Sequence, residues 1–580
     1  MTDAGHNVRA IGPSLGLVAL LAALLMVPRP GQGSVVVDHA AGGLSSPTEQ
    51  VSVGDGGAGT PSASDQPVQP TDGATVPDDE PSAGPTQSDV ASGPGATTGD
   101  DPVAPTNGAV PPPVVAPDPD AGDGSNGGRT YNGVSETEIL AGFAYQVEGC
   151  GGYDAGVVLE GLGINNDLGE QFRRAVELFN EHPVEALELT PEQASALTPG
   201  EGYWGRTVTP LVYDDKGVGC EEAGRAMAVQ ATEEDDIFAM VQDGSFGTES
   251  WVSEEVTARE RLHIGKADAS ERYFSDRNGY AWDGRWPQGD KSAVATASWV
   301  CRDLAGQPAT DTGDPLVAGQ PRSFGMLRFD DPDSEYIAEQ VKAELAKCGV
   351  ELVVESAQTL DPAVGAQQTQ SAMARMRREG VTSIFVAVDW TTMTAVTQSA
   401  SKQGYYPEWL ISSYFQHDQL ARVYYFYDGN HKNNVMGTTH FHSEHEPFQD
   451  ETYEFRMWQL AYPDRDQPET NWREVLYQTR TLFRGIYGAG PNLTPQTWAQ
   501  GLASFCDPCH RSDPLLPLQI LRPGHHAAYA DFGIIRWDPD RTDPTEIDST
   551  IGDYRTGWWE FLDGGQRYLG NATTPSNSVG

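Results

Sequence analysis

Two groups of side chains have the spacing of metal or haem ligands. Cys506, Cys509 and His510 form the pattern C-x-x-C-H, by which c-type haem is attached to a protein. His440 and His442 would point to the same face of a strand, a spacing that suits zinc or copper. The cysteine pair lies beside a Pro-rich stretch, not in a helical apolar pocket, and exposed or hydrogen-bonded histidines are commoner than ligands. We therefore expect no cofactor and no metal, and we keep a haem or metal redox protein as a less favoured alternative.

The sequence has no pattern typical of catalysis. It lacks a nucleophile elbow, a Gly-rich phosphate loop and the H-E-x-x-H zinc motif. Its 83 Asp and Glu against 37 Lys and Arg give a formal net charge of −46, which repels nucleic acid and anionic membrane surfaces. The composition therefore predicts a protein that is not an enzyme and has no nucleic-acid partner.

The amino-terminal quarter predicts export and a tether. Arg9 precedes an uncharged run over residues 10–28, so residues 1–33 are expected to be a signal peptide or a membrane anchor, with cleavage left open. Residues 34–128 contain no aromatic side chain and no Lys or Arg, and they are rich in Gly and Pro, which predicts a disordered linker. We expect a secreted or membrane-anchored protein that meets the membrane only through its N-terminal segment, and a disordered tail over residues 571–580.

The remaining region, residues 129–570, alternates short β-branched runs with segments of helical period. This alternation is typical of parallel sheets with crossover helices. The expected strands cover residues 139–144, 208–213, 237–241, 324–328, 351–354, 383–388 and 434–441. The expected helices cover residues 168–181, 221–233, 251–261, 293–304, 334–347, 367–378, 391–403, 451–460, 472–487 and 495–502.

These elements predict an α/β fold with two doubly wound parallel-sheet lobes joined by a hinge. Lobe one is expected to take residues 131–288 and 434–535, and lobe two residues 289–433 and 536–570. In this arrangement the strand over residues 434–441 would return the chain to lobe one.

The six cysteines all lie beyond the linker, an even number in a chain sent to an oxidising compartment, and three disulfides are expected. The topology favours pairing of sequence neighbours, while other connectivities stay open. The favoured pairs are Cys150 with Cys220, Cys301 with Cys348, and Cys506 with Cys509.

Four stretches of sequence carry a family resemblance. They read GVSETEILAGFA, RTVTPLVYDDKG, IFAMVQDGSFGT and LFRGIYGAGPNLTPQTWAQGL in chain order. Their order and spacing over residues 131–569 resemble the type 1 periplasmic binding proteins of the leucine/isoleucine/valine-binding group, the receptors of branched-chain amino-acid ABC importers. The resemblance implies two lobes joined by three crossing strands, with a ligand held in the cleft by hinge closure.

The ligand is expected at the carboxyl ends of the parallel strands, where open α/β sheets bind their ligands. In lobe one these ends carry Ser245 and Thr248 after the third strand, and Ala269 and Ser270 after the fourth. The three hydroxyl residues stand where the family places the hydroxyls and backbone amides that hold a ligand carboxylate. The alternative is that these hydroxyls only cap helices.

In lobe two the corresponding ends carry Asp331, Asp389, Trp390 and Tyr414. Amino-acid receptors of the family use an acidic side chain for the ligand ammonium, and the sequence SSYF after Ile411 has none. Asp389 or Asp331 could take that part, since a buried carboxylate needs a cationic partner. The aromatic side chains suit a ring-bearing ligand or a cation, or else pack in the core.

These features together predict an extracytoplasmic solute-binding receptor. It is expected to be the substrate-binding component of an ABC importer for amino acids or a related small polar or amphipathic solute, with an ABC permease as its membrane partner. The alternative is a membrane-tethered sensory or scavenging receptor with the same fold.

Overall fold

The computed structural model describes most of the chain after residue 125. The described residues are 126–147, 167–198, 200–217, 220–243, 249–359, 362–418, 423, 426–441, 452–465, 468, 471–505, 518–541, 557–570 and 572–573. The predicted signal or anchor segment and nearly all of the predicted linker lie outside them. None of the helices in the described ranges is long and apolar enough to cross a membrane.

A parallel sheet of five strands, in the order β2-β1-β3-β4-β5, organises the first part of the body. Its strands are β1 (Glu138–Tyr145), β2 (Thr207–Asp214), β3 (Ala239–Gln242), β4 (Leu262–Ile264) and β5 (Ala281–Trp282). On one face the sheet packs on α3 (Leu168–Glu181) and α15 (Trp472–Ala489), and on the other on α6 (Glu221–Val229) and α7 (Glu249–Ala258). Both faces are therefore buried, as in a doubly wound fold.

The helix α3 shows how the sequence forms these layers. The Asp167 side chain accepts a hydrogen bond from the backbone N–H of Glu170 and so caps the first turn. Phe172, Val176 and Phe179 recur at helical spacing and are all buried. The ring of Phe179 stacks on Phe483 of α15, with 4.9 Å between the ring centroids, so α3 is joined to a helix some 300 residues later in the chain.

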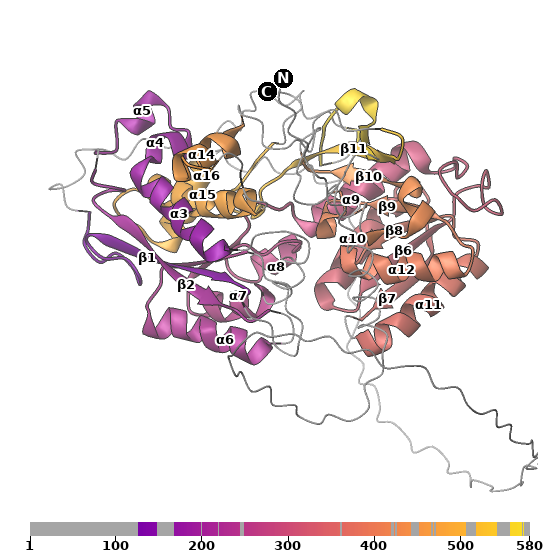
Figure 1. Cartoon of the computed structure of the whole chain (residues 1–580), viewed down its shortest axis with the longest axis horizontal. Helices are drawn as coiled ribbons and strands as arrows, with labels where there is room; N and C mark the ends of the chain where they lie inside the picture. Colours follow the sequence, from indigo (N-terminus) through magenta and orange to yellow (C-terminus); the bar gives the residue numbers. More distant parts are fainter. Residues whose placement is uncertain are drawn as a thin grey trace, which may run out of the picture. The chain divides into compact units, whose positions relative to one another are not determined.

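Six further helices complete or extend this part. They are α4 (Pro183–Leu187), α5 (Pro191–Ala194), α8 (Glu271–Ser275), α14 (Tyr453–Ala461) and α16 (Pro495–Ser504), together with the π-helical turn Gln230–Glu234 after α6. We call β1–β5 with α3–α8 and α14–α16 the small-sheet half (Figure 1).

A second, larger sheet has eight strands, in the order β12-β11-β10-β9-β8-β6-β7 with β13 paired to β11. The strands are β6 (Phe324–Phe329), β7 (Leu352–Gln358), β8 (Ser383–Ala387), β9 (Glu408–Ile411), β10 (Val435–Thr439), β11 (Asp531–Asp538), β12 (Trp558–Phe561) and β13 (Tyr568–Leu569). The first five run parallel, and β11–β13 pair in antiparallel fashion. The prediction of two doubly wound α/β units is confirmed, with an antiparallel edge added.

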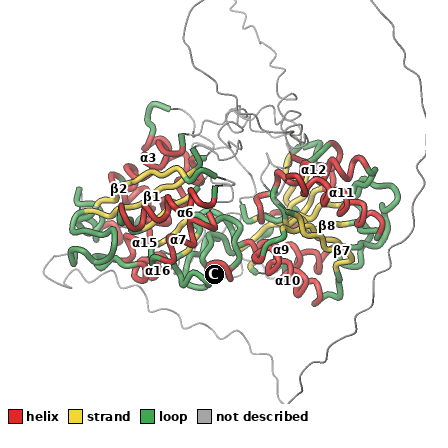
Figure 2. The backbone as a smooth tube through the Cα atoms, turned by 90° about the horizontal axis from the view of Figure 1, so that it is seen from below, coloured by secondary structure: helices red, strands yellow, loops and turns green. Residues whose placement is uncertain are grey.

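The large sheet is also covered on both faces. The helices α9 (Gly289–Trp299) and α10 (Pro332–Ala346) pack on one face, and α11 (Pro362–Arg378) and α12 (Trp390–Lys402) on the other (Figure 2). We call β6–β13 with α9–α12 the large-sheet half.

One strand differs from its predicted place. The sequence places residues 434–441 in lobe one, whereas β10 is hydrogen-bonded to β9 and β11 in the large sheet. All five residues of β10 are buried, so the strand has no alternation of buried and exposed residues to indicate which of the two sheets it joins. The strand β11, whose first residues were also expected in lobe one, lies in the same sheet.

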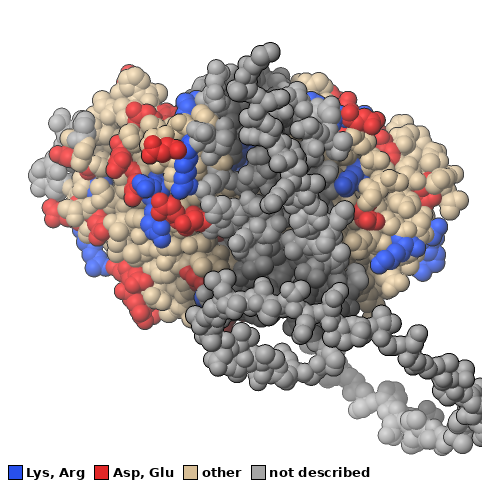
Figure 3. All heavy atoms as spheres, in the orientation of Figure 1, with Lys and Arg blue, Asp and Glu red and all other residues tan. Residues whose placement is uncertain are grey.

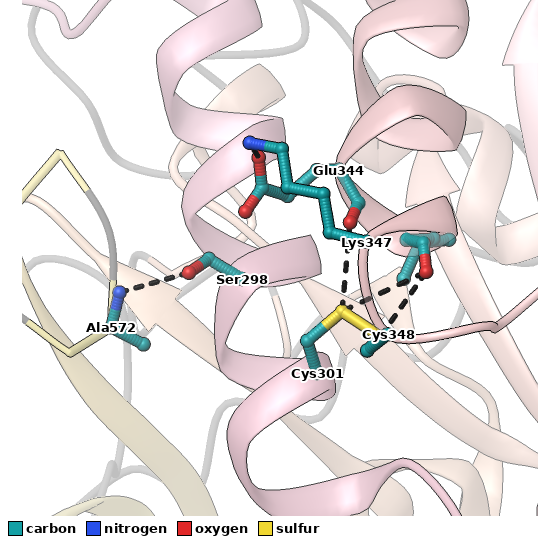
Figure 4. Close-up of a disulfide and its surroundings, with 7 residues drawn as sticks. Ser298, Cys301, Glu344, Lys347, Cys348 and Ala572 are labelled. Atoms are coloured by element: carbon teal, nitrogen blue, oxygen red, sulfur yellow. Dashed lines mark hydrogen bonds and ion pairs between the residues drawn. A yellow bond between two sulfur atoms is a disulfide. The ribbon is translucent and has the colours of Figure 1, made fainter. Parts of the chain in front are cut away.

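A disulfide joins Cys301 and Cys348, with 5.6 Å between their Cα atoms, and confirms the pairing that the topology favoured (Figure 4). It connects the π-helical turn Val300–Leu304 after α9 to the residue two places beyond α10. Cys220 is also disulfide-bonded. Its expected partner Cys150, and the pair Cys506 and Cys509, lie outside the described residues, so those pairings stay predictions.

The acidic surface of the small-sheet half is partly paired. Acidic and basic side chains alternate over the face shown in Figure 3, and Arg225 alone forms ion pairs with Glu221, Glu254 and Glu255. Such exposed pairs contribute little to stability, commonly below about 1 kcal/mol each. They reduce the repulsion between Glu221, Glu254 and Glu255, which gather around the same guanidinium.

Candidate functional site

The loop after β4 brings ionisable side chains to the carboxyl end of the small sheet. Gly265 begins the loop with φ +118°, and a Cβ at this position would lie 1.9 Å from the carbonyl oxygen of Gln242 in β3. Only glycine can pass the neighbouring strand so closely. The loop continues through Lys266, Asp268 and Ala269 to Ser270, where α8 begins.

Ser270 is fully buried and binds a carboxylate of the other half. Its backbone N–H donates to Oδ2 of Asp333 at 3.0 Å, and its hydroxyl donates to Oδ1 of the same side chain. The Ser270 hydroxyl oxygen also accepts the N–H of Tyr273 at 3.1 Å, so it caps α8 as well. Ser270 thus presents two donors to the carboxylate of Asp333, and its expected contact with a solute carboxylate stays a prediction.

The first turn of α10 gathers three of the predicted residues. Asp331 is its N-cap and accepts hydrogen bonds from the N–H groups of Asp333 and Ser334, both at 3.0 Å. Asp333 reaches Ser270, and the Ser334 hydroxyl lies 3.3 Å from the hydroxyl of Tyr414. Ser270, Asp331 and Tyr414 are far apart in the sequence, and their contacts bring them together at the first turn of α10.

Tyr414 is packed against the start of α9. Its side chain is only 2 % exposed, and a Cβ at Gly289 would lie 2.8 Å from its ring and 2.5 Å from the carbonyl oxygen of Asp268. The N–H of Gly289 donates to the carbonyl of Ala269 at 2.8 Å. Burial raises the pKa of Tyr414 well above its ordinary value, so its hydroxyl stays neutral and can donate a hydrogen bond.

Lys266 and Asp268, the two charged side chains of this loop, have pKa values that burial and nearby charges change. Oδ1 of Asp268 accepts the N–H of Phe415 from the large-sheet half at 2.9 Å. Burial raises the pKa of Asp268 to about 7, although Lys266 opposes the rise. Burial alone would lower the pKa of Lys266, but Glu249 and the other nearby acidic groups raise it overall, so its ammonium stays charged. The loop therefore offers a cation and a carboxylate that titrates near neutral pH.

The predicted residues Asp389 and Trp390 lie at a different helix. Asp389 is the N-cap of α12 and accepts hydrogen bonds from the N–H and the hydroxyl of Thr392, both at 2.9 Å. The ring of Trp390 packs on Phe426, with 4.3 Å between the centroids. The structure places this pair at α12, on the other face of the large sheet from α10.

Three other predicted positions are less informative. The side chain of Ala269 packs in a small apolar cluster with Tyr273, Phe274 and Ala281, and it is the carbonyl of this residue that faces α9. Ser245 and Thr248 lie outside the described residues, so their part in ligand binding stays a prediction.

Asp418 is a buried carboxylate that the sequence did not single out. Oδ2 accepts hydrogen bonds at 2.5 Å from the hydroxyls of Ser413, after β9, and Thr439, at the end of β10. Oδ1 is buried and has no hydrogen-bond partner among the described residues. Burial raises the pKa of Asp418 to about 6, while the two hydroxyls oppose the rise. The residue follows SSYF by a few positions in a segment without a recognisable motif, so only its three-dimensional neighbours reveal it.

Of the two histidines predicted as metal ligands, only His440 lies within the described residues. The N–H of His440 donates to the Ser413 hydroxyl at 2.8 Å, and burial lowers the pKa of His440 to about 3. This neutral side chain belongs to the hydrogen-bond network of Asp418. His442 and the C-x-x-C-H motif lie outside the described residues, and the described ranges contain no group of three side chains that could hold a metal.

An open surface pocket of about 330 Å³ lies elsewhere, between β7 and α11. Ser356, Gln368 and Arg375 are among its lining residues, and none of the predicted ligand residues is. It lies beside the last residues of the edge strand β7, and none of the residues of the site described above lines it.

A family model described as a periplasmic binding protein matches residues 165–542 of the chain. The match covers most of both halves, from the start of α3 to the end of β11. A search of curated proteins gave no match to the sequence.

Solved structures resemble the chain at low sequence identity. A solute binding protein of an ABC transporter from R. palustris, in complex with 4-hydroxybenzoate, is 11% identical with a TM-score of 0.48, over 73% of this chain and 97% of its own. A branched chain amino acid ABC transporter from Thermus thermophilus with bound valine is 13% identical with a TM-score of 0.48, over 72% and 98%. A possible leucine/isoleucine/valine-binding protein from Rhodopirellula baltica SH 1 is 12% identical with a TM-score of 0.45, over 69% and 94%. At these identities the ligands of those proteins do not carry over to this chain.

Proposed function

The chain belongs to the periplasmic binding protein family, and from that premise we propose that it is an extracytoplasmic receptor for an amino acid or a related small polar or amphipathic solute. The solute binds between the two halves, at the loops that follow β4, β6 and β9. Closure of the halves removes the solute from water, and the closed form is the one a membrane partner recognises.

The gathering of Ser270, Asp331 and Tyr414 at the first turn of α10 carries this proposal. These residues come from three separate loops at carboxyl ends of parallel strands, which is where ligands of open α/β sheets bind. Ser270 already binds a carboxylate, that of Asp333, through its N–H and its hydroxyl. A solute carboxylate would be held by the same two donors, with the ammonium of Lys266 in the same loop favouring negative charge.

The same region supports recognition of the rest of the solute. Phe415 follows Tyr414 with 4.2 Å between the ring centroids, and its ring also meets Phe329 at 5.3 Å. These rings offer an apolar or cation-binding wall. Asp418, whose Oδ1 is unpaired among the described residues, is a better candidate than Asp331 or Asp389 for a solute ammonium, because those two carboxylates are engaged in capping.

A thermal-shift screen of the full chain tests the proposal. The probes are branched-chain amino acids, other amino acids, amides, urea-like compounds and aromatic acids, including valine and 4-hydroxybenzoate. A solute that binds only the folded state raises the melting temperature by mass action, by a few degrees at saturation. Native mass spectrometry of freshly purified protein checks for a solute that has been carried through purification.

Two variants locate the site once a solute is found. Ser270→Ala, made in an Asp333→Ala chain so that no carboxylate of the protein competes for the two donors, removes one of them and is expected to weaken binding of an acidic solute by about tenfold or more. Glu335→Ala, on the exposed surface of α10, is the matched control and leaves binding unchanged. If no probe stabilises the protein, or if adding Ser270→Ala to the Asp333→Ala chain leaves its affinity for the solute unchanged, the proposed site is wrong.

Asp389→Ala and Trp390→Ala test whether the solute also reaches α12. Unchanged affinity in both would restrict the site to the α10 cluster. A loss in either would extend it across the edge of the large sheet and restore the wider site expected from the sequence.

Export and an importer partner complete the proposal. The apolar run over residues 10–28 supports placement outside the cytoplasmic membrane, anchored or secreted. Cell fractionation is expected to find the chain outside the cytoplasm. An ABC permease whose ATPase activity rises only with the solute-loaded receptor would establish transport as its purpose, and a chain found in the cytoplasm would contradict it.

A further inference from the structure

Asp333 connects the two halves of the body by binding Ser270, the residue proposed to hold a solute carboxylate. Both of its carboxylate oxygens accept hydrogen bonds from Ser270, and Ser270 is fully buried. Asp333 belongs to α10 of the large-sheet half and Ser270 to the loop after β4 of the small-sheet half. A two-donor bond to a charged acceptor is among the stronger polar contacts available to a protein.

This contact is not needed to build α10. The helix already has an N-cap in Asp331, which accepts the N–H groups of Asp333 and Ser334. The side chain of Asp333 is therefore free of the capping duty that acidic residues in a first turn often have. Its described hydrogen bonds are those that it accepts from Ser270.

Neighbouring contacts join the same two segments. The N–H of Phe415 donates to Asp268 at 2.9 Å, and the guanidinium of Arg272 lies 5.6 Å from the centre of the Tyr336 ring. Both pairs link the segment 266–272 to the large-sheet half. Three contacts therefore hold the segment 266–272 against the large-sheet half: Asp333 with Ser270, Phe415 with Asp268, and Tyr336 with Arg272. Of these, only the contact of Asp333 occupies the donors of Ser270.

We propose that Asp333 is an internal latch, a carboxylate of the protein itself that holds the halves together at Ser270 and must give way when an acidic solute takes that position. The part that concerns the solute rests on the proposed function, and the latch itself does not. A solute carboxylate gains only the difference between its own bonds to Ser270 and those of Asp333. Asp333 thereby determines which solutes bind, because neutral solutes need not displace it.

Residue-resolved hydrogen–deuterium exchange on the full chain tests the latch without a known solute. In Asp333→Ala, exchange of the Ser270 amide is expected to rise by about tenfold or more, since its acceptor is gone. Exchange of the Phe415 amide is expected to rise with it, although Asp333 does not touch Phe415, because the two halves separate more often. Glu335→Ala, two residues along α10, leaves both amides unchanged.

Acetate is the probe for the solute position. In Asp333→Ala, sodium acetate is expected to restore protection at Ser270, where sodium chloride at the same ionic strength does not. Asp333→Asn keeps one acceptor and loses the charge. Exchange of its Ser270 amide is expected to be faster than in the unaltered chain and slower than in Asp333→Ala. This variant retains the shape of the side chain and guards against a folding defect in the alanine variant.

Each result decides one part of the proposal. If Asp333→Ala changes Ser270 alone and leaves Phe415 protected, the contact is local and the latch is wrong. If both amides exchange faster but acetate restores neither, Asp333 holds the halves together without standing in for a solute carboxylate. A screen of the unaltered chain that finds no solute counts against the proposed function and leaves the exchange result standing.

Discussion

The helices α10 and α12 begin in the same way but have different neighbours. Each follows a parallel strand of the large sheet, β6 or β8, and each is capped by an aspartate, Asp331 or Asp389, that accepts backbone N–H groups of the first turn. Judged by local sequence the two starts are equivalent, because an Asp before a helical segment is an ordinary N-cap.

The difference lies in what each first turn contacts. The residues after Asp331 bind Ser270 and Tyr414, whereas Trp390, after Asp389, packs on Phe426 in the same half. The helix α10 also has a disulfide just beyond its other end, at Cys348 (Figure 4). A capping aspartate therefore indicates where a strand ends and a helix begins. Whether the residues beside it contribute to the site depends on which face of the sheet the helix packs against.

The largest expected difference in stability between α10 and α12 comes from the disulfide. Its partners are 47 residues apart in the sequence, and closing a loop of that length stabilises a fold by about 4 kcal/mol in the chain-entropy account. The double variant Cys301→Ser/Cys348→Ser is expected to lose about that much free energy of unfolding, measured by urea denaturation. Treating the double variant with reductant controls for the other cysteines. A loss below about 1 kcal/mol would mean that packing alone holds α10.

Tyr414 is expected to give the next largest effect. It is buried in the core of the large-sheet half, so Tyr414→Ala should cost about 3 kcal/mol of unfolding free energy through the cavity it leaves. Tyr414→Phe, which loses only the contact to Ser334, should cost about 1 kcal/mol. Trp390→Ala, at a partly exposed ring, should cost less than Tyr414→Ala. An equal or larger loss for Trp390 would remove the distinction drawn between the two helices.

The two caps offer a matched pair. Asp331→Ala and Asp389→Ala should each lower the free energy of unfolding by about 1 kcal/mol, because each leaves backbone N–H groups without their acceptor. Only Asp331→Ala should also speed hydrogen exchange at Ser270, since that cap orders the turn carrying Asp333. The same exchange result from Asp389→Ala would show that the two helix starts are coupled after all.

The smallest expected effect is a pH dependence from Asp268. Its folded-state pKa of about 7 lies above the value near 4 of an unfolded Asp. The contribution of Asp268 to stability is therefore complete below about pH 4 and is lost as the pH rises through 7, when the partly buried carboxylate must ionise near Asp283 and Glu249, although Lys266 favours its charged form. A pKa rise from about 4 to about 7 corresponds to at most about 4 kcal/mol, and the partial exposure of Asp268 reduces this value, so Asp268→Asn should flatten the slope and change stability at pH 8 by on the order of 1 kcal/mol. Unfolding free energies of both chains from pH 4 to 8 test it, with Glu335→Gln as the control carboxylate.

Much of the fold follows from periodicity. The helix predicted over residues 168–181 has those bounds in α3, and the strands predicted at 139–144 and 208–213 correspond to β1 and β2 with one or two residues more. Periodicity works here because each element buries one face or both, and burial shows in the order of apolar residues. It could not assign β10 to its sheet, since a strand buried on both faces has no side that indicates its neighbour.

The residues of the candidate site were predicted only in part. Ser270 and Tyr414 were identified from their positions at strand ends, and the structure brings both to α10. Asp333 and Asp418 were missed, because nothing in an acidic sequence distinguishes one carboxylate from the many that face solvent. What marks them is their contacts, two donors on Ser270 for Asp333 and two hydroxyls for Asp418.

The sequence by itself determined the family, the α/β class and the alternation of elements, since these depend on order along the chain, and it favoured the Cys301–Cys348 pairing that the structure then showed. Only the tertiary structure decided which capped strand end meets the other half and which carboxylate occupies Ser270. The reason is physical: local order specifies a cap or a turn from a few neighbouring residues, whereas a carboxylate acquires its partner, its burial and its pKa from residues that are distant in the chain.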